Sequence, residues 1–437
     1  MVESALINTL LGCLAGTLAG IMPGTGLLVA LVCAYPYLIT LDLIGILCFY
    51  IGLANLAQFT GSVTAIYFGV PGETNSVPSV VEGHALSKKG KGHTAIVGTS
   101  LSSVVAGILT LLLLVSFFPL YDDLFQILYQ TKYQALILGF ALCIFLITSK
   151  HKLITIGLMV IAFILGRIGY NEFTGGYFLS FDSVDLKTGL PIFPVIIGIL
   201  VVPYLLKTLN FVHSGDNNKI FNAIAIQTFY KNIRYSFLGT IIGFFCGLVP
   251  AVSTVLATNL AHKIAKVFNK QQPSYSALLS AEASNNSAIL VTLVPLILLG
   301  IPITGSEAML LNIMDRNLFD LNWSTVIADG YQYMIMLSVI LSLFLGVLVS
   351  WPMSKHLQNF LSYTKNYFKL FVILLLVISL IFISAETGQY LYFTICLIVF
   401  SVIGYWLRHV DILPFLFVFL LQNKLESVFV LSYTLYT

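Results

Sequence analysis

Residues 94–120 read TAIVGTSLSSVVAGILTLLLLVSFFPL, a run of 27 residues without a charged side chain. About 20 consecutive apolar residues are enough to carry an α-helix across the hydrocarbon core of a bilayer. Comparable stretches recur along all 437 residues, of which 58% are hydrophobic and 9% are charged, against about 25% charged in an ordinary globular protein. The apolar residues form blocks and do not alternate with polar ones as in a membrane β-barrel. The sequence therefore predicts an all-α polytopic membrane protein.

Two kinds of apolar segment alternate along the chain. In front of each set of plain spans, the apolar sequence is broken by proline and glycine, at 23–26 and 69–72 in the first half and at Pro250 and 300–302 in the second. Each half is expected to contain a broken or re-entrant hairpin, a broken crossing and about four plain transmembrane helices. The plain spans lie at 94–120, 135–149, 153–169 and 192–206, and at 333–350, 370–384, 390–407 and 412–421.

The breaks repeat at nearly constant spacing. Gly12, Gly16, Gly20 and Pro23 match Gly239, Gly243, Gly247 and Pro250 with an offset of 227, and Asn55 and Gly69-x-Pro71 match Asn286 and Gly300-x-Pro302 with an offset of 231. Chance identity of a glycine-rich pattern is the alternative, but it does not explain two matches in the same order. We expect two repeats, residues 1–208 and 236–437, joined by a cytoplasmic linker at 209–235.

The basic residues predict how the two repeats are related. Lysine and arginine gather in cytoplasmic loops, and every basic loop can be cytoplasmic if each half crosses the membrane five times. An odd number of crossings turns the second half upside down, which gives the inverted-topology repeats of many secondary transporters. The basic groups are Lys88, Lys89 and Lys91; Lys150 and Lys152; Lys207, Lys219, Lys231 and Arg234; Lys263, Lys266 and Lys270; and Lys355, Lys365 and Lys369.

The four breaks indicate one central site. Irregular backbone at membrane depth is tolerated only where it is buried in protein or lines a water-filled cavity. A half-helix whose N-terminus reaches that depth offers unpaired N–H groups and a positive dipole end to an anion. In the turn at 23–26, Gly24 and Gly26 would let a ligand approach the backbone, and Thr25 adds a hydroxyl donor. Tight helix packing is the alternative role for such glycines.

Hydroxyl and amide side chains are dense at 62–76 and 280–306. Adjacent Asn285 and Asn286 are costly in lipid unless they face protein, water or ligand. Their oxygens suit Na⁺ and their N–H groups suit a carboxylate, although hydrogen bonds between helices are the alternative. The candidate substrate-binding residues are Pro23, Gly24, Thr25, Gly26, Ser62, Thr64, Pro71, Gly72, Ser253, Asn285, Asn286, Ser287, Pro302, Gly305 and Ser306.

Three acidic residues, Glu73, Glu282 and Glu307, lie beside the breaks. Buried charges of this kind often couple transport to protons or cations, and capping of half-helices is the alternative left open. The candidate ion-coupling residues are Glu73, Asn75, Glu282, Asn286 and Thr304, with a Na⁺ ion expected near Asn285 and Asn286.

Several functions are excluded or disfavoured. The net charge is +3, and no basic run is long enough for a nucleic-acid surface. No protease, hydrolase, Walker A or Cys/His metal motif occurs, so no enzyme activity and no cofactor beyond a coupling ion, Na⁺ or H⁺, is expected. Two alternatives remain: an intramembrane enzyme that uses Glu73 and Glu282 on a lipid-linked substrate, and a passive anion channel.

Several motifs resemble the large membrane subunit of the bacterial tripartite tricarboxylate transporters. They are the glycines and proline of 16–26, the stretch Gly61-Ser62-Val63-Thr64, Pro71-Gly72-Glu73, Glu82-Gly83-His84-Ala85, Glu282-Ala283-Ser284-Asn285-Asn286 and Gly300-Ile301-Pro302. The resemblance runs from about Gly12 to about Glu426. Two departures are Ala251-Val252-Ser253 after Pro250, where the family tends to keep glycines, and Ile303-Thr304 inserted between Pro302 and Gly305.

The resemblance implies a partner set and a cargo. It implies a multi-pass permease in the lipid bilayer of the cell inner membrane, working with a small membrane subunit and a periplasmic solute-binding protein. The cargo would be a carboxylate such as citrate, moved inward by an ion gradient.

Overall fold

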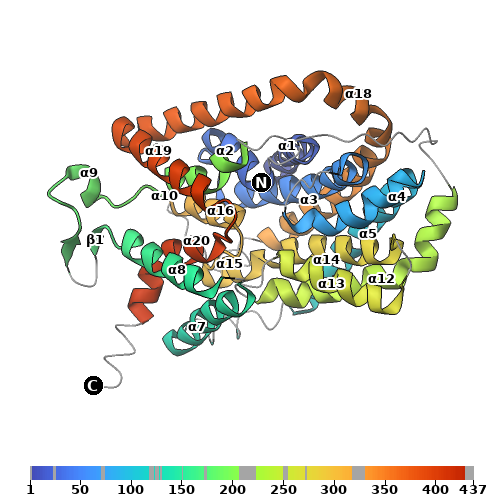
Figure 1. Ribbon diagram of the computed structural model, residues 1–437, viewed down its shortest axis with the longest axis horizontal. Helices are drawn as coiled ribbons and strands as arrows, with labels where there is room; N and C mark the ends of the chain where they lie inside the picture. Colours follow the sequence, from blue (N-terminus) through green and yellow to red (C-terminus); the bar gives the residue numbers. More distant parts are fainter. Residues whose placement is uncertain are drawn as a thin grey trace.

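The computed structural model describes residues 2–22, 26–69, 74–117, 123, 127, 130–149, 151–171, 175–205, 223–249, 254–270, 273–316 and 330–428. These residues are almost entirely helical (Figure 1). In this part of the chain, six helices are long and apolar enough to cross a membrane by length and composition. They are Val2–Ile21, Leu43–Phe68, Gly92–Phe117, Tyr275–Leu299, Tyr331–Met353 and Tyr390–Leu407. The prediction of an all-α polytopic membrane protein is confirmed.

The first half contains α1 to α11. Its elements are α1 (Val2–Ile21), α2 (Gly26–Leu38), α3 (Leu43–Phe68), the 3₁₀ turn η1 (Thr74–Ser76), the π-helical turn η2 (Ser79–His84), α4 (Ala85–Lys88), α5 (Gly92–Phe117), α7 (Thr131–Thr148), α8 (Lys152–Gly166), β1 (Gly169–Asn171), β2 (Gly176–Phe178), α9 (Val184–Lys187), α10 (Ile192–Ile196), the π-helical turn η4 (Ile197–Val201) and α11 (Val202–Leu205). Strands β1 and β2 form a small antiparallel hairpin.

The second half contains α12 to α20. Its elements are α12 (Ala223–Leu248), α13 (Thr254–Phe268), α14 (Tyr275–Val291), α15 (Leu293–Leu299), α16 (Gly305–Arg316), α18 (Tyr331–Thr387), α19 (Tyr390–Leu407) and α20 (Leu413–Leu420). Each of the four predicted breaks separates two helical segments in this order of elements. The break after α3 and the break after α15 both begin with a left-handed glycine, Gly69 with φ 67° and Gly300 with φ 58°. A side chain would strain either position, which explains why glycine stands at both.

Rows of glycine bring helices together in the same way in both halves. A Cβ atom added to Gly12 or Gly16 of α1 would lie 2.1 or 2.3 Å from a backbone carbonyl oxygen of α3. A Cβ atom added to Gly239 or Gly243 of α12 would lie 2.0 or 2.2 Å from a backbone carbonyl oxygen of α14. Small residues permit such close approach between membrane helices. The matching glycines of the two halves therefore make matching contacts.

Helix α14 lies at the centre of the bundle. Every residue from Ser276 to Val291 is buried, because α14 is enclosed by α12 and α13 of its own half and by α5 and η2 of the first half. These helices lie together on the right of Figure 1, and α7, α8, α19 and α20 gather at the other end. The centre of the molecule is thus built from the broken segments of both halves.

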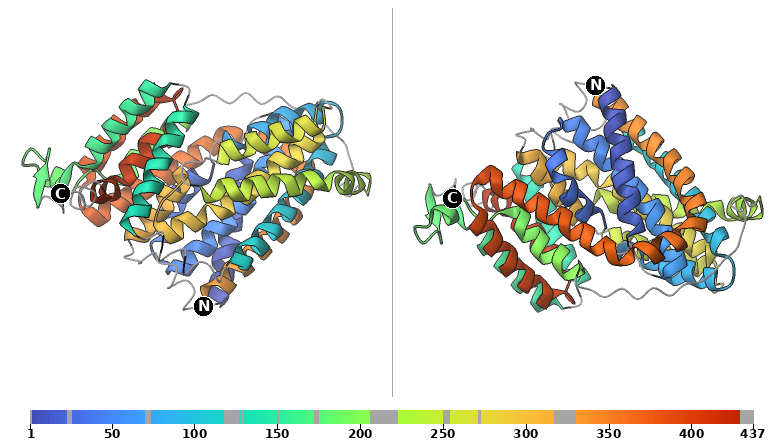
Figure 2. Two further views of the ribbon diagram at one scale, coloured as in Figure 1. Left: turned by 90° about the horizontal axis from the view of Figure 1, so that it is seen from below. Right: turned by 90° about the horizontal axis from the view of Figure 1, so that it is seen from above.

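Helix α18 differs from the prediction. Residues 333–350 and 370–384 were expected as separate spans joined by a basic loop, but both belong to one continuous helix of 57 residues. At about 1.5 Å per residue its contour length is about 86 Å, far more than the hydrocarbon core of about 30 Å, and Figure 2 shows that it bends sharply between two limbs. It contains Pro352 and then runs across one side of the molecule to α19 (Figure 2). Lys355, Lys365 and Lys369 therefore belong to a helix.

The predicted division of the chain is only partly visible. Residues 223–235 of the expected linker 209–235 form the first part of α12, and residues 206–222 lie outside the described part. The boundaries 1–208 and 236–437 and the inversion of one repeat relative to the other stay predictions.

Candidate functional site

A group of polar side chains crosses the buried contact between the two halves. We call it the polar seam and define it as Gln58, Ser62, Asn75, Ser79, Glu282 and Asn285. The first four come from α3, η1 and η2, and the last two come from α14. All six are buried. A buried polar group is costly unless it is hydrogen-bonded, and each of these side chains has a partner across the contact.

Glu282 is held by two serine hydroxyls of the first half. Ser62 Oγ lies 2.5 Å from Glu282 Oε1, and Ser79 Oγ lies 2.8 Å from Oε2. Ser62 Oγ also lies 3.0 Å from the carbonyl oxygen of Gln58. An ionised Glu282 can accept from Ser62, whereas a protonated Glu282 can donate to Ser62, which then donates to Gln58. The same arrangement therefore satisfies the carboxyl group with and without its proton.

Asn285 lies one turn further along α14 on the same side. Its Nδ2 donates to Gln58 Oε1, and its Oδ1 accepts from Asn75 Nδ2 at 2.8 Å. The amide thus joins α3 to the turn η1 that follows the broken crossing. Amides and hydroxyls that pair with each other in this way are also the groups that hydrogen-bond a carboxylate.

Asn286 and Ser287 face a different helix. Asn286 Nδ2 donates to Ser103 Oγ of α5 at 2.9 Å, and Thr110 Oγ1 of α5 donates to Ser287 Oγ at 2.7 Å. Successive residues of a helix point about 100° apart, so Asn285 and Asn286 cannot share one set of partners. Asn286 Oδ1 is buried and has no hydrogen-bond partner among the described residues.

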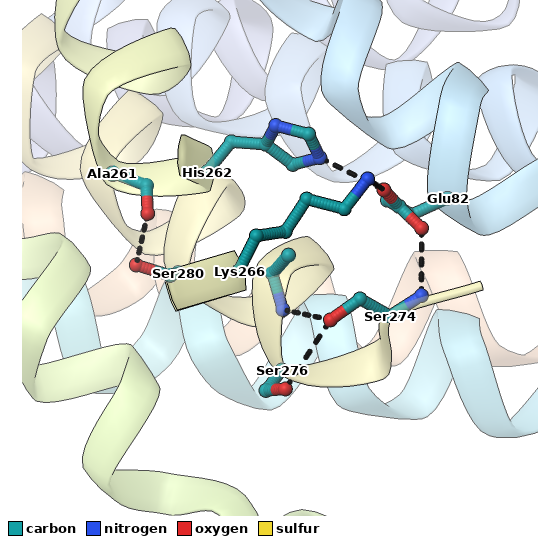
Figure 3. A network of polar contacts seen from close by, with 8 residues as sticks. Glu82, Ala261, His262, Lys266, Ser274, Ser276 and Ser280 are labelled. Atoms are coloured by element: carbon teal, nitrogen blue, oxygen red, sulfur yellow. Dashed lines mark hydrogen bonds and ion pairs between the residues drawn. The ribbon is translucent and has the colours of Figure 1, made fainter. Parts of the chain in front are cut away.

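An ion cluster lies next to the polar seam (Figure 3). Glu82 of η2 accepts from His262 Nε2 at 2.9 Å and from Lys266 Nζ at 2.5 Å, both through Oε1. Its Oε2 accepts from the backbone N–H of Ser274 at 2.6 Å. Burial disfavours the charge of Glu82, but the bonds from His262, Lys266 and Ser274 outweigh burial and lower the pKa of Glu82 to about 2.

Two groups of residues were missed as site residues. Gln58 and Ser79 lie among other polar residues, and the sequence contains no sign that these two face Asn285 and Glu282. The ion cluster joins Glu82 to residues about 180 positions away. The only signal was the spacing of His262 and Lys266, which places both on one face of a helix.

The residues after the second broken crossing form a helix cap. Thr304 Oγ1 accepts from the N–H of Glu307 at 3.3 Å, and Glu307 Oε2 accepts from the N–H groups of Thr304 at 3.1 Å and Ile303 at 2.7 Å. This reciprocal pair is a capping box at the start of α16. Glu307 therefore has the capping role that the sequence left open, in a buried place.

Other candidates take part in packing away from the seam. Thr64 Oγ1 donates to the carbonyl oxygen of Gly20 at 3.1 Å, which ties α3 to α1. A Cβ atom added to Gly305 would lie 3.6 Å from Leu28, so the start of α16 lies beside the start of α2, where Gly26 is the first residue. Ser306 Oγ lies 2.9 Å from Thr304 Oγ1, and Pro302 precedes the cap.

Seven candidate residues lie outside the described part of the chain. They are Pro23, Gly24, Thr25, Pro71, Gly72, Glu73 and Ser253. Within the described part, no group of three or more His, Cys, Asp and Glu side chains could hold a metal ion.

An apolar pocket lies between α3, α5, α18 and the segment of α14 and α15. Its lining contains Gln332 and otherwise only apolar side chains, such as Leu47, Leu114, Leu293 and Met336. No charged side chain and no hydroxyl lines this pocket, so it does not suit a carboxylate. The polar seam is the better candidate site.

Comparisons with known proteins identify the family of the chain. A protein from Agrobacterium vitis, described as an uncharacterized 52.8 kDa protein in the TAR-I ttuC' 3' region, is 26% identical over 300 residues. The match covers 67% of this chain, and the chain spans 60% of that relative's length. No solved structure matches the chain. The family model described as the tripartite tricarboxylate transporter TctA family matches residues 6–418, which include every residue of the polar seam and the ion cluster. The chain belongs to the tripartite tricarboxylate transporter TctA family.

Proposed function

We propose that this chain is the permease subunit of a binding-protein-dependent secondary transporter that imports carboxylates. The cargo is a tricarboxylate such as citrate, or a related di- or monocarboxylate, and an ion gradient drives it inward. The observation that carries the proposal is the polar seam, a set of hydroxyl and amide donors buried between the broken segments of two similar halves in a member of a transporter family. No organic cofactor is part of this proposal.

The seam supplies what a carboxylate needs. When no cargo is bound, the Ser62 and Ser79 hydroxyls donate to Glu282, and the Asn75 amide donates to Asn285. A carboxylate that enters between the halves exchanges those bonds for bonds to itself, so little hydrogen-bonding energy is lost. Alternate opening of the two sides of this contact would then move the cargo across the membrane.

Two buried groups are suited to couple an ion to the cargo. Glu282 keeps its hydrogen bonds in both protonation states, which is what a proton carrier requires. Asn286 Oδ1 is a buried amide oxygen without a partner among the described residues, and amide oxygens are ligands for hard cations. The first group supports H⁺ as the coupling ion, and the second supports Na⁺.

The family supports a proposal for the partners and the location. We propose that a periplasmic solute-binding protein delivers the carboxylate and that a small membrane subunit completes the complex in the cell inner membrane. The isolated chain would then bind the cargo weakly, and the binding protein would select among related acids.

Transport by the reconstituted complex tests the proposal. The chain, the small subunit and the binding protein are placed in proteoliposomes, and uptake of radiolabelled citrate is measured under a Na⁺ gradient, a pH gradient or neither. Accumulation above equilibrium that needs the binding protein and one gradient is the expected result. Uptake that only equilibrates would identify a channel, and absence of uptake of every carboxylate tested would refute the proposal.

Two variants locate the site in the same assay. Asn286→Ala is expected to abolish uptake while the protein still inserts, because it removes the buried amide oxygen that is proposed as a ligand of the coupling ion. Asn232→Ala is the control, since the Asn232 side chain bonds only the carbonyl oxygen of Thr228 within its own helix. Normal uptake by Asn286→Ala would remove this residue from the site.

A further inference from the structure

The ion cluster around Glu82 has the composition of a carboxylate receptor. His262 and Lys266 approach one oxygen of the carboxylate, and the N–H of Ser274 approaches the other. All three donors belong to one part of the second half, α13 and the turn that leads into α14. The carboxylate comes from a different part, the turn η2 of the first half. Figure 3 shows these donors converging on the Glu82 side chain.

We propose that His262 and Lys266 form a second carboxylate-binding site, next to the polar seam, in which a carboxylate of the cargo takes the place of Glu82. The inference rests on the proposed function, because its ligand is the anion that the chain is proposed to carry. It assigns a binding role to two side chains, His262 and Lys266, that the polar seam does not use.

The burial of the three side chains favours such an exchange. The Glu82 side chain is 2% exposed, whereas those of His262 and Lys266 are 14% and 27% exposed. His262 and Lys266 are therefore more accessible to an anion from the solvent than Glu82 is. The Lys266 ammonium group has three N–H donors and uses one of them on Glu82, so the incoming carboxylate can bind before Glu82 leaves.

The position of the cluster fits a step on the transport path. Glu82 and Ser79 lie on the same π-helical turn, and Ser79 contacts Glu282 of the polar seam. On the other side, exposed lysines follow both elements: Lys88 follows η2, and Lys270 follows α13. Such lysines raise the local concentration of anions. The site thus joins the polar seam to the end of the molecule that the sequence predicts to be cytoplasmic.

At the three donors, the exchange replaces one carboxylate with another. Glu82 is ionised at physiological pH because its pKa is about 2, so one carboxylate replaces another. The cost to the cargo is competition with a tethered group, whose effective concentration is high. Removing the charge of Glu82 therefore frees the site for the cargo, whereas removing the charge of Lys266 destroys the site. The two changes have opposite effects on affinity.

Citrate binding to the purified full-length chain in detergent, measured by calorimetry, tests this prediction without any ion gradient. Glu82→Gln is expected to tighten citrate binding at least tenfold, and Lys266→Gln to weaken it at least tenfold. The double variant should resemble Lys266→Gln. Lys263→Gln is the control, because Lys263 lies on the same helix, carries the same charge and is exposed. It should change affinity less than twofold.

Two results would overturn the inference. If Glu82→Gln and Lys266→Gln both weaken citrate binding, the ion cluster is only a tie between the halves. If neither changes it, citrate does not bind there. If Glu82→Gln fails to fold, Glu82→Asp replaces it in the test. Its shorter side chain withdraws from Lys266, so Glu82→Asp is expected to tighten citrate binding as well. Weaker citrate binding by Glu82→Asp would overturn the inference. Loss of uptake by the complete wild-type complex would instead refute the proposed function, whatever the binding data show.

Discussion

Replacing Gly243 with alanine is expected to separate α12 from α14 and to impair transport. The added Cβ atom would lie 2.2 Å from the carbonyl oxygen of Ser284 and 2.8 Å from its Cα atom. Non-bonded carbon and oxygen atoms hardly ever approach closer than 3.0 Å, so the helices would have to move apart by about 0.8 Å at this point. Backbone atoms are in the way, and no side-chain rotation can relieve the contact.

The size of the effect follows from two comparisons. Overpacking of a close contact costs about 1–3 kcal/mol. Protein N–H···O bonds cover a range of only about 0.5 Å in length, so a movement of 0.8 Å is enough to break one. Helix α14 carries Glu282 and Asn285, whose bonds to the first half depend on its position. We therefore expect lower thermal stability together with reduced citrate uptake.

A melting curve of the purified protein and the proteoliposome uptake assay measure both effects. Gly157→Ala in α8 is the matched control, because a Cβ atom there would meet nothing within 4 Å. Alanine favours a helix over glycine by up to about 1 kcal/mol, so this control should melt at or above the wild-type temperature. A Gly243→Ala protein with wild-type stability and uptake would show that this glycine does not set the position of α14.

Three further predictions concern charged side chains. Glu307→Gln should keep the stability of the wild type, because glutamine can also close the capping box at α16. Glu307→Ala should lose about 1 kcal/mol of stability. Equal melting temperatures for the two variants would contradict the cap. The Lys424 ammonium group donates to the carbonyl oxygens of Leu299 and Gly300 at the end of α15. Lys424→Met should therefore remove about 1–2 kcal/mol of stability and lower the melting temperature. An unchanged melting curve would argue against this role. The lowered pKa of Glu82 means that its ion pairs stabilise the fold above its ordinary pKa of 4.5 and are lost as pH falls towards about 2. Glu82 should therefore not titrate between about pH 6 and 8. In a His262→Gln background, which removes the imidazole in contact with Glu82, the effect of Glu82→Gln on citrate affinity should be constant across that range, and a slope there would contradict the lowered pKa of Glu82.

Hydropathy predicted most of the fold because a helix that crosses lipid must be apolar over about 20 residues. The apolar blocks correspond to helices, and proline and glycine mark the four breaks between them. The rule fails for α18, where residues 351–369 are polar and basic but still helical. Loss of hydrophobicity marks the end of a lipid-buried segment and does not require the end of a helix.

The candidate site was predicted through α14 and only partly through its partners. The dense run of Ser and Asn in 280–287 identified the central helix. The side chain that each of these residues contacts depends on the rotation and packing of α14, which hydropathy does not encode. Asn285 and Asn286 were therefore predicted as a pair, although they face different helices. Glu82 and Lys266 meet only through the tertiary fold, and no local pattern connects them.

The contact between α14 and the first half has a consequence for motion. In the part of the chain that the structure describes, six hydrogen bonds between two side chains cross this contact. Hydrogen bonds between membrane helices contribute about 0.6 kcal/mol each on average, or about 4 kcal/mol together. The separated form lacks these bonds, and this cost lowers its population by a factor on the order of a thousand. The polar bonds therefore help to order the contact at rest, and their contribution alone does not lock it.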